Sequence, residues 1–196
     1  MMETKLVAIA GGIGSGKSVV SAILRIMGYD VYDCDAEAKR LMNTSQVIKD
    51  DLINAFGKSS VTEEGIINTA HISSIVFQDN SALSTINSIV HPRVKEDILV
   101  KLQNSEQKVF FVETAILMQS NLVDIVDEAW LVTAPEDVRI KRVMIRNRVT
   151  ADDVKKRIAA QNGQDYSLIP NLKEIVNDGI KAILPQIEGL IQEMKH

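Results

Sequence analysis

Apolar residues along this chain fall into five short runs that predict buried strands. Continuous apolar runs of four to eight residues are typical of parallel strands that are covered on both faces of a sheet. Longer stretches with apolar residues at helical spacing separate the runs, which favours a doubly wound α/β sheet. The predicted strands are residues 6–10, 29–34, 109–112, 129–132 and 174–177.

One region departs from this alternation. Residues 36–103 contain no good strand pattern but several amphipathic helical patterns, including 47–56 and 94–102. Pro92 is expected to occupy the first turn of a helix, where its missing N–H costs nothing. The pattern predicts a helical insertion beyond the carboxyl ends of the strands, where open α/β sheets bind ligands. A final amphipathic helix is expected over 180–194.

Composition narrows the class of protein. A length of 196 residues suits one α/β domain, here residues 1–196, that carries the insertion. The net charge of −4 and the 4% aromatic content argue against nucleic acid as a partner. Cys34 is the only cysteine, which excludes an intramolecular disulfide and favours a reducing compartment. Because no apolar run approaches the length of a membrane span, we expect a cytoplasmic protein without a membrane partner.

A glycine-rich segment follows the first predicted strand. Residues 11–18 read Gly-Gly-Ile-Gly-Ser-Gly-Lys-Ser, which fits the phosphate-binding loop G-x-x-x-x-G-K-[ST], and a helical pattern over 19–27 comes next. Glycines let backbone N–H groups approach phosphate oxygens, and the start of a helix adds further donors. Lys17 is expected to reach the β- and γ-phosphates of ATP, and Ser18 to ligate Mg²⁺. The residues expected to bind the nucleotide are Gly12, Ile13, Gly14, Ser15, Gly16, Lys17, Ser18 and Val19.

Two aspartates close the second predicted strand. In an extended chain the carboxylates of Asp33 and Asp35 point to the same side, because side-chain direction alternates along a strand. One of them can accept the proton of an attacking hydroxyl, or orient Mg²⁺ through water. Asp35 also suits the N-cap of the helical pattern that follows, and the two roles are compatible. Cys34, between the aspartates, is interpreted as a packing residue.

A basic segment follows Pro135. Arg139, Arg142 and Arg146 are spaced three and four residues apart, so on a helix they form one stripe. Such a stripe can clamp a transferring phosphoryl group, but an ordinary solvated helix face explains it equally well. Thr150 and Asp153 predict a capping box at the start of the next helix.

Three further segments carry polar residues of interest. Glu113 closes the third predicted strand and suits either a carboxylate near Mg²⁺ or a hydrogen-bonded structural acid. His91, late in the helical insertion, suits a structural role on its own. Asn177-Asp178-Gly179 predicts a turn after the last strand, whose backbone groups can contact an adenine.

Taken in order, these motifs resemble those of the dephospho-CoA kinase family, and the resemblance covers nearly the whole chain. The loop at 11–18 matches the family's opening motif, and Asp33-Cys34-Asp35 matches its Asp-x-Asp. The other matching residues are His91-Pro92, the lid residues Arg142, Arg146, Arg157 and Gln161, and Asn177-Asp178-Gly179.

The resemblance implies a P-loop kinase core that transfers the γ-phosphoryl of ATP to the ribose 3′-hydroxyl of dephospho-CoA. It assigns residues 36–103 to CoA binding and residues 136–168 to a lid, and it leaves open a monomer or a homo-oligomer. Asp35 becomes the catalytic base. The other implied site residues are Lys17 and Arg142 for catalysis, Arg146 and Asn177 for ATP, and Asp33, His91, Arg157 and Gln161 for dephospho-CoA.

The chain departs from the family pattern at two positions and also over residues 162–173, which lack the family's Ala-Asp pair. Gln119 stands where the family usually has a glutamate, and Ser18 replaces the more common threonine while keeping the hydroxyl. A kinase for another nucleoside or nucleotide remains the nearer alternative function. A nucleotide-dependent switch is the more distant one, because the chain has no Asn-Lys-x-Asp sequence to specify guanine.

Overall fold

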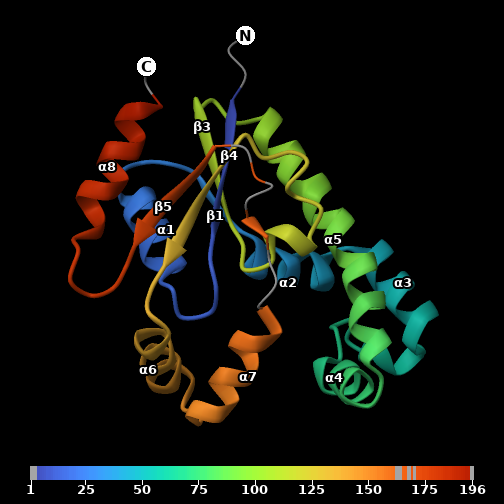
Figure 1. Ribbon diagram of the computed structural model, residues 1–196. Helices are drawn as coiled ribbons and strands as arrows, with labels where there is room; N and C mark the ends of the chain where they lie inside the picture. The colour runs from blue at the N-terminus through green and yellow to red at the C-terminus, as the bar shows by residue number, and fades with distance from the viewer. Residues whose placement is uncertain (1–3, 162–164, 167–168, 170, 195–196) are drawn as a thin grey trace. The chain divides into compact units, whose positions relative to one another are not determined.

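The chain divides into two compact units, a sheet-containing unit and a helical unit. The computed structural model describes residues 4–161, 165–166, 169 and 171–194. The first unit comprises Met1–Tyr32 and Ser105–His196, and the second comprises Asp33–Asn104 (Figure 1). No helix in the described ranges has the length and apolar character needed to span a membrane.

A five-stranded sheet with the order β2-β3-β1-β4-β5 builds the first unit. The pairs β1–β3, β1–β4 and β4–β5 are all parallel, which confirms the predicted fold class. The predicted second strand was too long, because only its middle residues are extended and Cys34 already begins a helix. The strands are β1 Lys5–Ala10, β2 Val31–Asp33, β3 Val109–Glu113, β4 Glu128–Thr133 and β5 Leu172–Val176.

The core of this unit lies between the sheet and two helices. Helices α1 (Lys17–Ile26) and α8 (Ile183–Glu193) pack their apolar residues against the sheet. Figure 1 shows both helices at the left of the view. The fully buried Trp130 of β4 lies at the centre of this layer. Phe111 contacts Trp130 at a ring-centroid distance of 5.1 Å and Tyr29 at 5.4 Å. Apolar burial of this extent holds the central strand β1, and therefore the loop that follows it, in a fixed place.

Helix α8 begins three residues later than the sequence pattern predicts. The carboxylate of Asp178 accepts hydrogen bonds of 2.8 Å from the backbone N–H groups of Ile180 and Lys181. These bonds fold residues 178–181 into a turn, which competes with helix formation there. The predicted turn after the last strand is therefore confirmed, and it delays the helix.

Replacing each of two glycines in this part of the chain by alanine should change the free energy of unfolding in opposite directions. Neither Gly189, inside α8, nor Gly179 has an atom within 4 Å of an added Cβ, but Gly179 has a φ of +86°. We expect Gly189→Ala to raise the free energy of unfolding by about 0.5–1 kcal/mol, because alanine favours the helix. Gly179→Ala should lower it by roughly 1 kcal/mol, because an L side chain is strained at positive φ. Urea denaturation measures both, and equal effects of one sign would contradict this explanation.

Helices make up the second unit. They are α2 Cys34–Thr44, α3 Gln46–Phe56, α4 Thr69–Gln78 and α5 Asn80–Gln103, with a short 3₁₀ helix, η1, at Lys58–Ser60. The helical patterns of the insertion are thereby confirmed, but the role expected of Pro92 was wrong. Pro92 lies inside the 24-residue helix α5 rather than at a helix start. The buried side chains of Val90 and Val94 flank it, and this packing outweighs the lost backbone hydrogen bond.

A network of four charged side chains joins α2 to α5. Arg40 contacts Glu37 at 2.7 Å and Asp97 at 3.0 Å. Lys101 contacts the same two carboxylates at 2.9 and 3.5 Å. The hydrogen bond from Lys101 is the largest cause that lowers the pKa of Glu37 below its ordinary value of 4.5, and Arg40 adds to it. The folded protein therefore favours the charged form of Glu37.

This lowered pKa predicts how stability depends on pH. Stability from Glu37 is fully present above its unfolded pKa and is lost as the pH falls through the lower, folded pKa. We expect Glu37→Gln to lower the free energy of unfolding at pH 7 by about 1 kcal/mol or less. The gap between wild type and variant should close as the pH falls below 4.5, which urea denaturation at stepped pH measures. The control is Glu96→Gln, an exposed partner of Arg93, and a gap independent of pH would contradict the prediction.

Candidate active site

The glycine-rich loop joins the central strand β1 to helix α1. Gly16 is the N-cap of α1 in a left-handed conformation, with a φ of 101°, and no side chain caps the helix. Gly14 also has a positive φ, of 78°. The first N–H groups of α1 are thus left for an anion, as at other phosphate-binding helix termini.

Lys17 and Ser18 start the first turn of α1. The Nζ of Lys17 donates to the carbonyl oxygen of Gly11 at 2.8 Å and of Gly12 at 3.5 Å, so the ammonium group lies back along the loop. The Ser18 side chain is exposed at the helix start. Among the described residues, no group of three or more His, Cys, Asp or Glu side chains is placed to hold a metal. A Mg²⁺ carried on ATP phosphates needs one or two protein oxygens, which the Ser18 hydroxyl fits.

Ile13, in the middle of the loop, is held by helices α6 (Glu136–Asn147) and α7 (Ala151–Gln161). Its N–H donates to Oε1 of Gln161 at 2.7 Å, and its carbonyl accepts from Nε of Arg139 at 2.9 Å. Its side chain packs on a buried cluster of Val143, Val154 and Ile158. Sequence reasoning placed Arg139 in a basic stripe, but spacing alone could not show that it holds the loop.

Asn177 holds the second half of the loop. Its side chain is only 6% exposed, and its Nδ2 donates to the carbonyl of Ser15 at 2.8 Å. Arg142 donates to both the backbone oxygen and Oδ1 of Asn177, each at 3.0 Å. A Cβ at Gly16 would overlap Nδ2 of Asn177, so the close approach requires glycine there. The structure thus shows Asn177 and Arg142 against the loop, where the sequence predicts ATP binding and catalysis.

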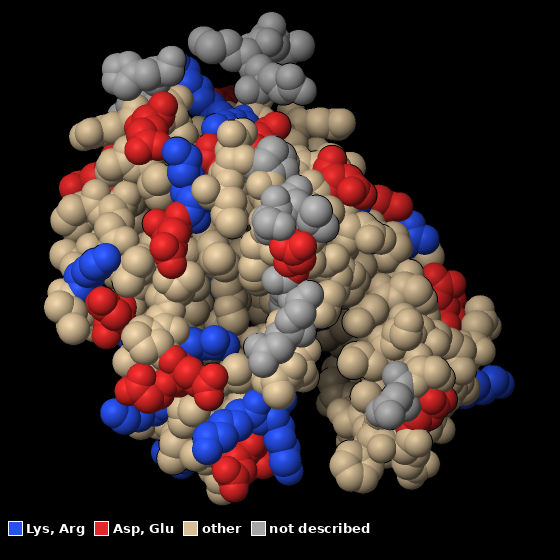
Figure 2. Space-filling model, in the orientation of Figure 1, with Lys and Arg blue, Asp and Glu red and all other residues tan. Residues whose placement is uncertain are grey.

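The predicted arginine stripe does lie on one helix, but its members differ in surroundings. Arg139 and Arg142 face the loop, whereas Arg146 is exposed and donates to the neighbouring Asn147 at 3.0 Å. Arg157 is exposed on α7. Figure 2 shows acidic side chains mixed with the basic ones over α6 and α7, in line with the pair between Lys141 and Asp137. Arg139 and Arg142 of the stripe therefore contact the loop, whereas Arg146 belongs to a solvated helix face.

The link between α6 and α7 carries the predicted capping box. The N–H of Asp153 donates to Oγ1 of Thr150 at 3.3 Å, and the carboxylate of Asp153 accepts from the Thr150 N–H at 3.4 Å. This reciprocal pair fixes the start of α7. Residues 162–164, 167 and 168 of the predicted lid, at 136–168, lie outside the described residues.

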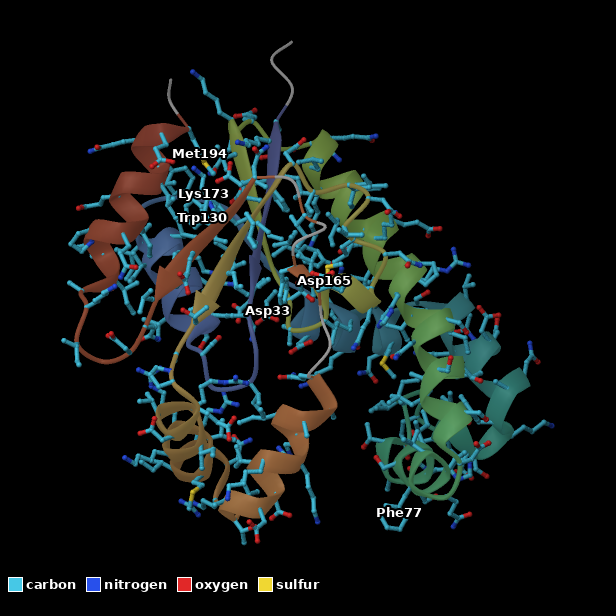
Figure 3. All side chains as sticks on the ribbon, viewed as in Figure 1. Asp33, Phe77, Trp130, Asp165, Lys173 and Met194 are labelled. Carbon is cyan, nitrogen blue, oxygen red and sulfur yellow. The ribbon has the colours of Figure 1, made fainter. Side chains whose placement is uncertain are left out.

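The two aspartates after β2 occupy different positions in a helix start. Asp33, labelled in Figure 3, ends β2 and caps α2 by accepting from the N–H groups of Asp35 and Ala36, both at 3.0 Å. Asp33 is therefore the N-cap that we assigned to Asp35. The expected same-side extended pair was also wrong, because the helix begins at Cys34.

Asp35 is left exposed in the first turn of α2. No hydrogen bond or ion pair from another described residue engages its carboxylate. Cys34 is buried, which agrees with a packing role.

The structure also places three other residues that the sequence analysis singled out. Glu113 ends β3, and Gln119 lies in a 3₁₀ helix, η2, over Leu117–Gln119. His91 is half-buried on α5, next to Pro92. The structure assigns none of them a role by itself.

A shallow pocket of about 220 Å³ lies at the other end of the sheet, where the strands begin. Its lining includes Lys173 and Met194, which Figure 3 labels near Trp130. Both of its lysines are paired at 2.7 Å, Lys5 with Glu128 and Lys173 with Glu193. Because open α/β sheets bind ligands beyond the carboxyl ends of their strands, we do not assign this pocket to the site.

Comparison with known proteins identifies the family of the chain. The sequence model of the family described as dephospho-CoA kinase matches residues 5–180. The chain belongs to the dephospho-CoA kinase family. It is 36% identical over 186 residues to the dephospho-CoA kinase of Bacteroides fragilis strain YCH46, covering 94% of this chain and 90% of that protein. It is 32% identical to the one from Carboxydothermus hydrogenoformans, covering 100% and 97% of the two chains.

Solved structures share this fold. A Thermus thermophilus protein has a TM-score of 0.79 at 27% identity, over 98% of this chain and 96% of that one. The dephospho-CoA kinase from Campylobacter jejuni has a TM-score of 0.69 at 21% identity, over 96% of each chain. Shikimate kinase from Acinetobacter baumannii, at 12% identity and a TM-score of 0.53, shares the fold over 98% of this chain and 94% of its own. The resemblance stated from the motifs is therefore confirmed.

Proposed function

We propose that this protein is a dephospho-CoA kinase, which transfers the γ-phosphoryl of ATP to the ribose 3′-hydroxyl of dephospho-CoA and releases CoA and ADP. The observation that carries the proposal is the phosphate loop after β1, in a chain that matches the family over residues 5–180. We further propose that it acts in the cytoplasm, where ATP is abundant and a lone cysteine stays reduced.

The loop and the start of α1 form the ATP side of the reaction. Residues 12–19 form the phosphate site, in which the loop N–H groups other than those of Ile13, Ser15 and Val19, which bond within the protein, donate to the phosphates. The Lys17 ammonium exchanges its loop carbonyls for phosphate oxygens when ATP binds. The Ser18 hydroxyl would hold Mg²⁺, and the ion would offset the negative charge of the phosphates. Arg142 and Arg146 of α6 stabilise the charge that spreads over the transferring group.

Asp35 forms the acceptor side. Its exposed carboxylate accepts the proton of the 3′-hydroxyl as the oxygen attacks the γ-phosphorus, so that ADP departs as the leaving group. Asp33 fixes the backbone at this point through its cap of α2. Residues 36–103, with His91, bind the CoA moiety in this proposal.

The helices α6 and α7 form the lid. Gln161 and Arg157, on α7, are proposed to close over the bound substrates and to exclude the water that would otherwise hydrolyse ATP. The hydrogen bond between Gln161 and Ile13 supports this role, since it links α7 directly to the phosphate loop.

An ADP-release assay over a panel of acceptors tests the function. With ATP and Mg²⁺ we expect rapid ADP release with dephospho-CoA and only background release with nucleoside monophosphates, adenosine or no acceptor. Release with a nucleoside monophosphate instead would favour the rival nucleotide kinase. ATP binding with no acceptor-dependent release would favour a nucleotide-dependent switch.

A further inference from the structure

Three carbonyl groups of the phosphate loop point outward to side-chain donors. Arg139 donates to Ile13 O at 2.9 Å, Arg142 to Gly14 O at 3.5 Å, and Asn177 to Ser15 O at 2.8 Å. A trans peptide unit is planar, so its C=O and N–H point in opposite directions. Holding the Ile13 carbonyl outward therefore turns the N–H of Gly14 to the inner side of the loop.

Gly12 shows a second, independent link to Arg139. Its φ lies outside the left-handed region, so its backbone does not require glycine. A Cβ at Gly12 would instead overlap the Arg139 guanidinium. The space above Gly12 is thus filled by the same side chain that holds Ile13.

The position of Arg139 on its helix strengthens this link. A Cβ at Gly14 would lie 2.7 Å from the backbone oxygen of Arg139 and 2.9 Å from Cγ2 of Val143. The first turn of α6 therefore packs directly on the loop, which places the Cα of Arg139 close to Gly14.

We propose that Arg139 is a positioning residue for ATP. It fixes the inward N–H of Gly14 through its hydrogen bond to the Ile13 carbonyl, and position 12 is a glycine because a side chain there would overlap the guanidinium. The inference rests on the proposed function only in taking the loop as the ATP site. Arg139 acts through the loop backbone, whereas Lys17 reaches the phosphates themselves.

A double-mutant cycle on ATP binding tests this. Calorimetry with a non-hydrolysable ATP analogue and Mg²⁺ compares wild type, Arg139→Ala, Gly12→Ala and the double variant. We expect each single change to weaken ATP binding about tenfold, because each should remove the charge-assisted hydrogen bond from Arg139 to the Ile13 carbonyl. The double variant should bind no more weakly than Arg139→Ala, because the guanidinium that the added methyl would overlap is then absent. Lys141→Ala, which removes an exposed charge from the same helix, should bind like wild type.

Steady-state kinetics separates a positioning role from a merely structural one, because only a positioning role should change KM for ATP selectively. KM for ATP should rise about tenfold in Arg139→Ala, while kcat and KM for dephospho-CoA stay within about twofold. Additive losses in the cycle, wild-type binding by Arg139→Ala, or equal rises in both KM values would overturn the inference. If Arg139→Ala does not fold, Gly12→Ala alone decides it, since wild-type affinity in that variant contradicts the proposal. Wild-type protein that binds no ATP analogue would instead refute the proposed function.

Discussion

Asp35→Asn should lower kcat with dephospho-CoA by about two to four orders of magnitude, the contribution of a positioned proton acceptor. The amide keeps the size of the side chain and cannot take up the hydroxyl proton. Because Asp33, not Asp35, caps α2, the substitution should leave the helix start intact. Rapid-quench measurement of phosphoryl transfer under saturating ATP isolates this step.

Two further measurements separate proton acceptance from a loss of fold. ATP affinity should be unchanged in Asp35→Asn, and its urea midpoint should stay close to wild type. Asp50→Asn is the matched control, since this exposed carboxylate of α3 accepts from Gln46 and an amide oxygen can do the same. Wild-type kcat in Asp35→Asn would rule out Asp35 as the base.

Lys17→Met should lower kcat/KM for ATP by roughly two to three orders of magnitude, as loss of one electrostatic group in an oxyanion-type site does. In the structure the ammonium donates to the loop carbonyls of Gly11 and Gly12. Methionine keeps the unbranched apolar part of the side chain, so we expect the sheet and α1 to stay intact. Steady-state kinetics with varied ATP measures the effect. Lys108→Met, which changes an exposed lysine directly before β3, is the charge-matched control. A loss confined to KM for dephospho-CoA would contradict the assignment of Lys17 to ATP.

Much of the sheet could be predicted from the sequence, because buried parallel strands leave continuous apolar runs. The run at 109–112 corresponds to β3, and the weak run at 174–177 still marks an edge strand, β5. Helix boundaries were less predictable. Asp33 and Asp35 both suit an N-cap, and only the backbone shows that the helix begins between them. Pro92 could not be placed, since the packing around α5 rather than local preference keeps the helix continuous.

The sequence predicts site residues where a motif carries its own chemistry, as at Lys17 and Ser18. Contacts between distant residues were not predictable. The stripe at Arg139 and Arg142 fixes their common helix face, but nothing in the spacing shows that this face meets Ile13 and Asn177. The sequence likewise does not show why position 12 is a glycine. The structure gives the reason, because the Arg139 guanidinium occupies the place of a Cβ there.

The identity of the phosphorylated product tests the proposed reaction most directly. Protein incubated with dephospho-CoA, Mg²⁺ and ATP labelled in the γ-phosphoryl should yield ADP and one labelled product. We predict that mass spectrometry and phosphorus NMR will identify this product as CoA, with the label in a monoester on the ribose 3′-oxygen. Label found only in inorganic phosphate, or on another hydroxyl, would contradict transfer to the 3′-hydroxyl.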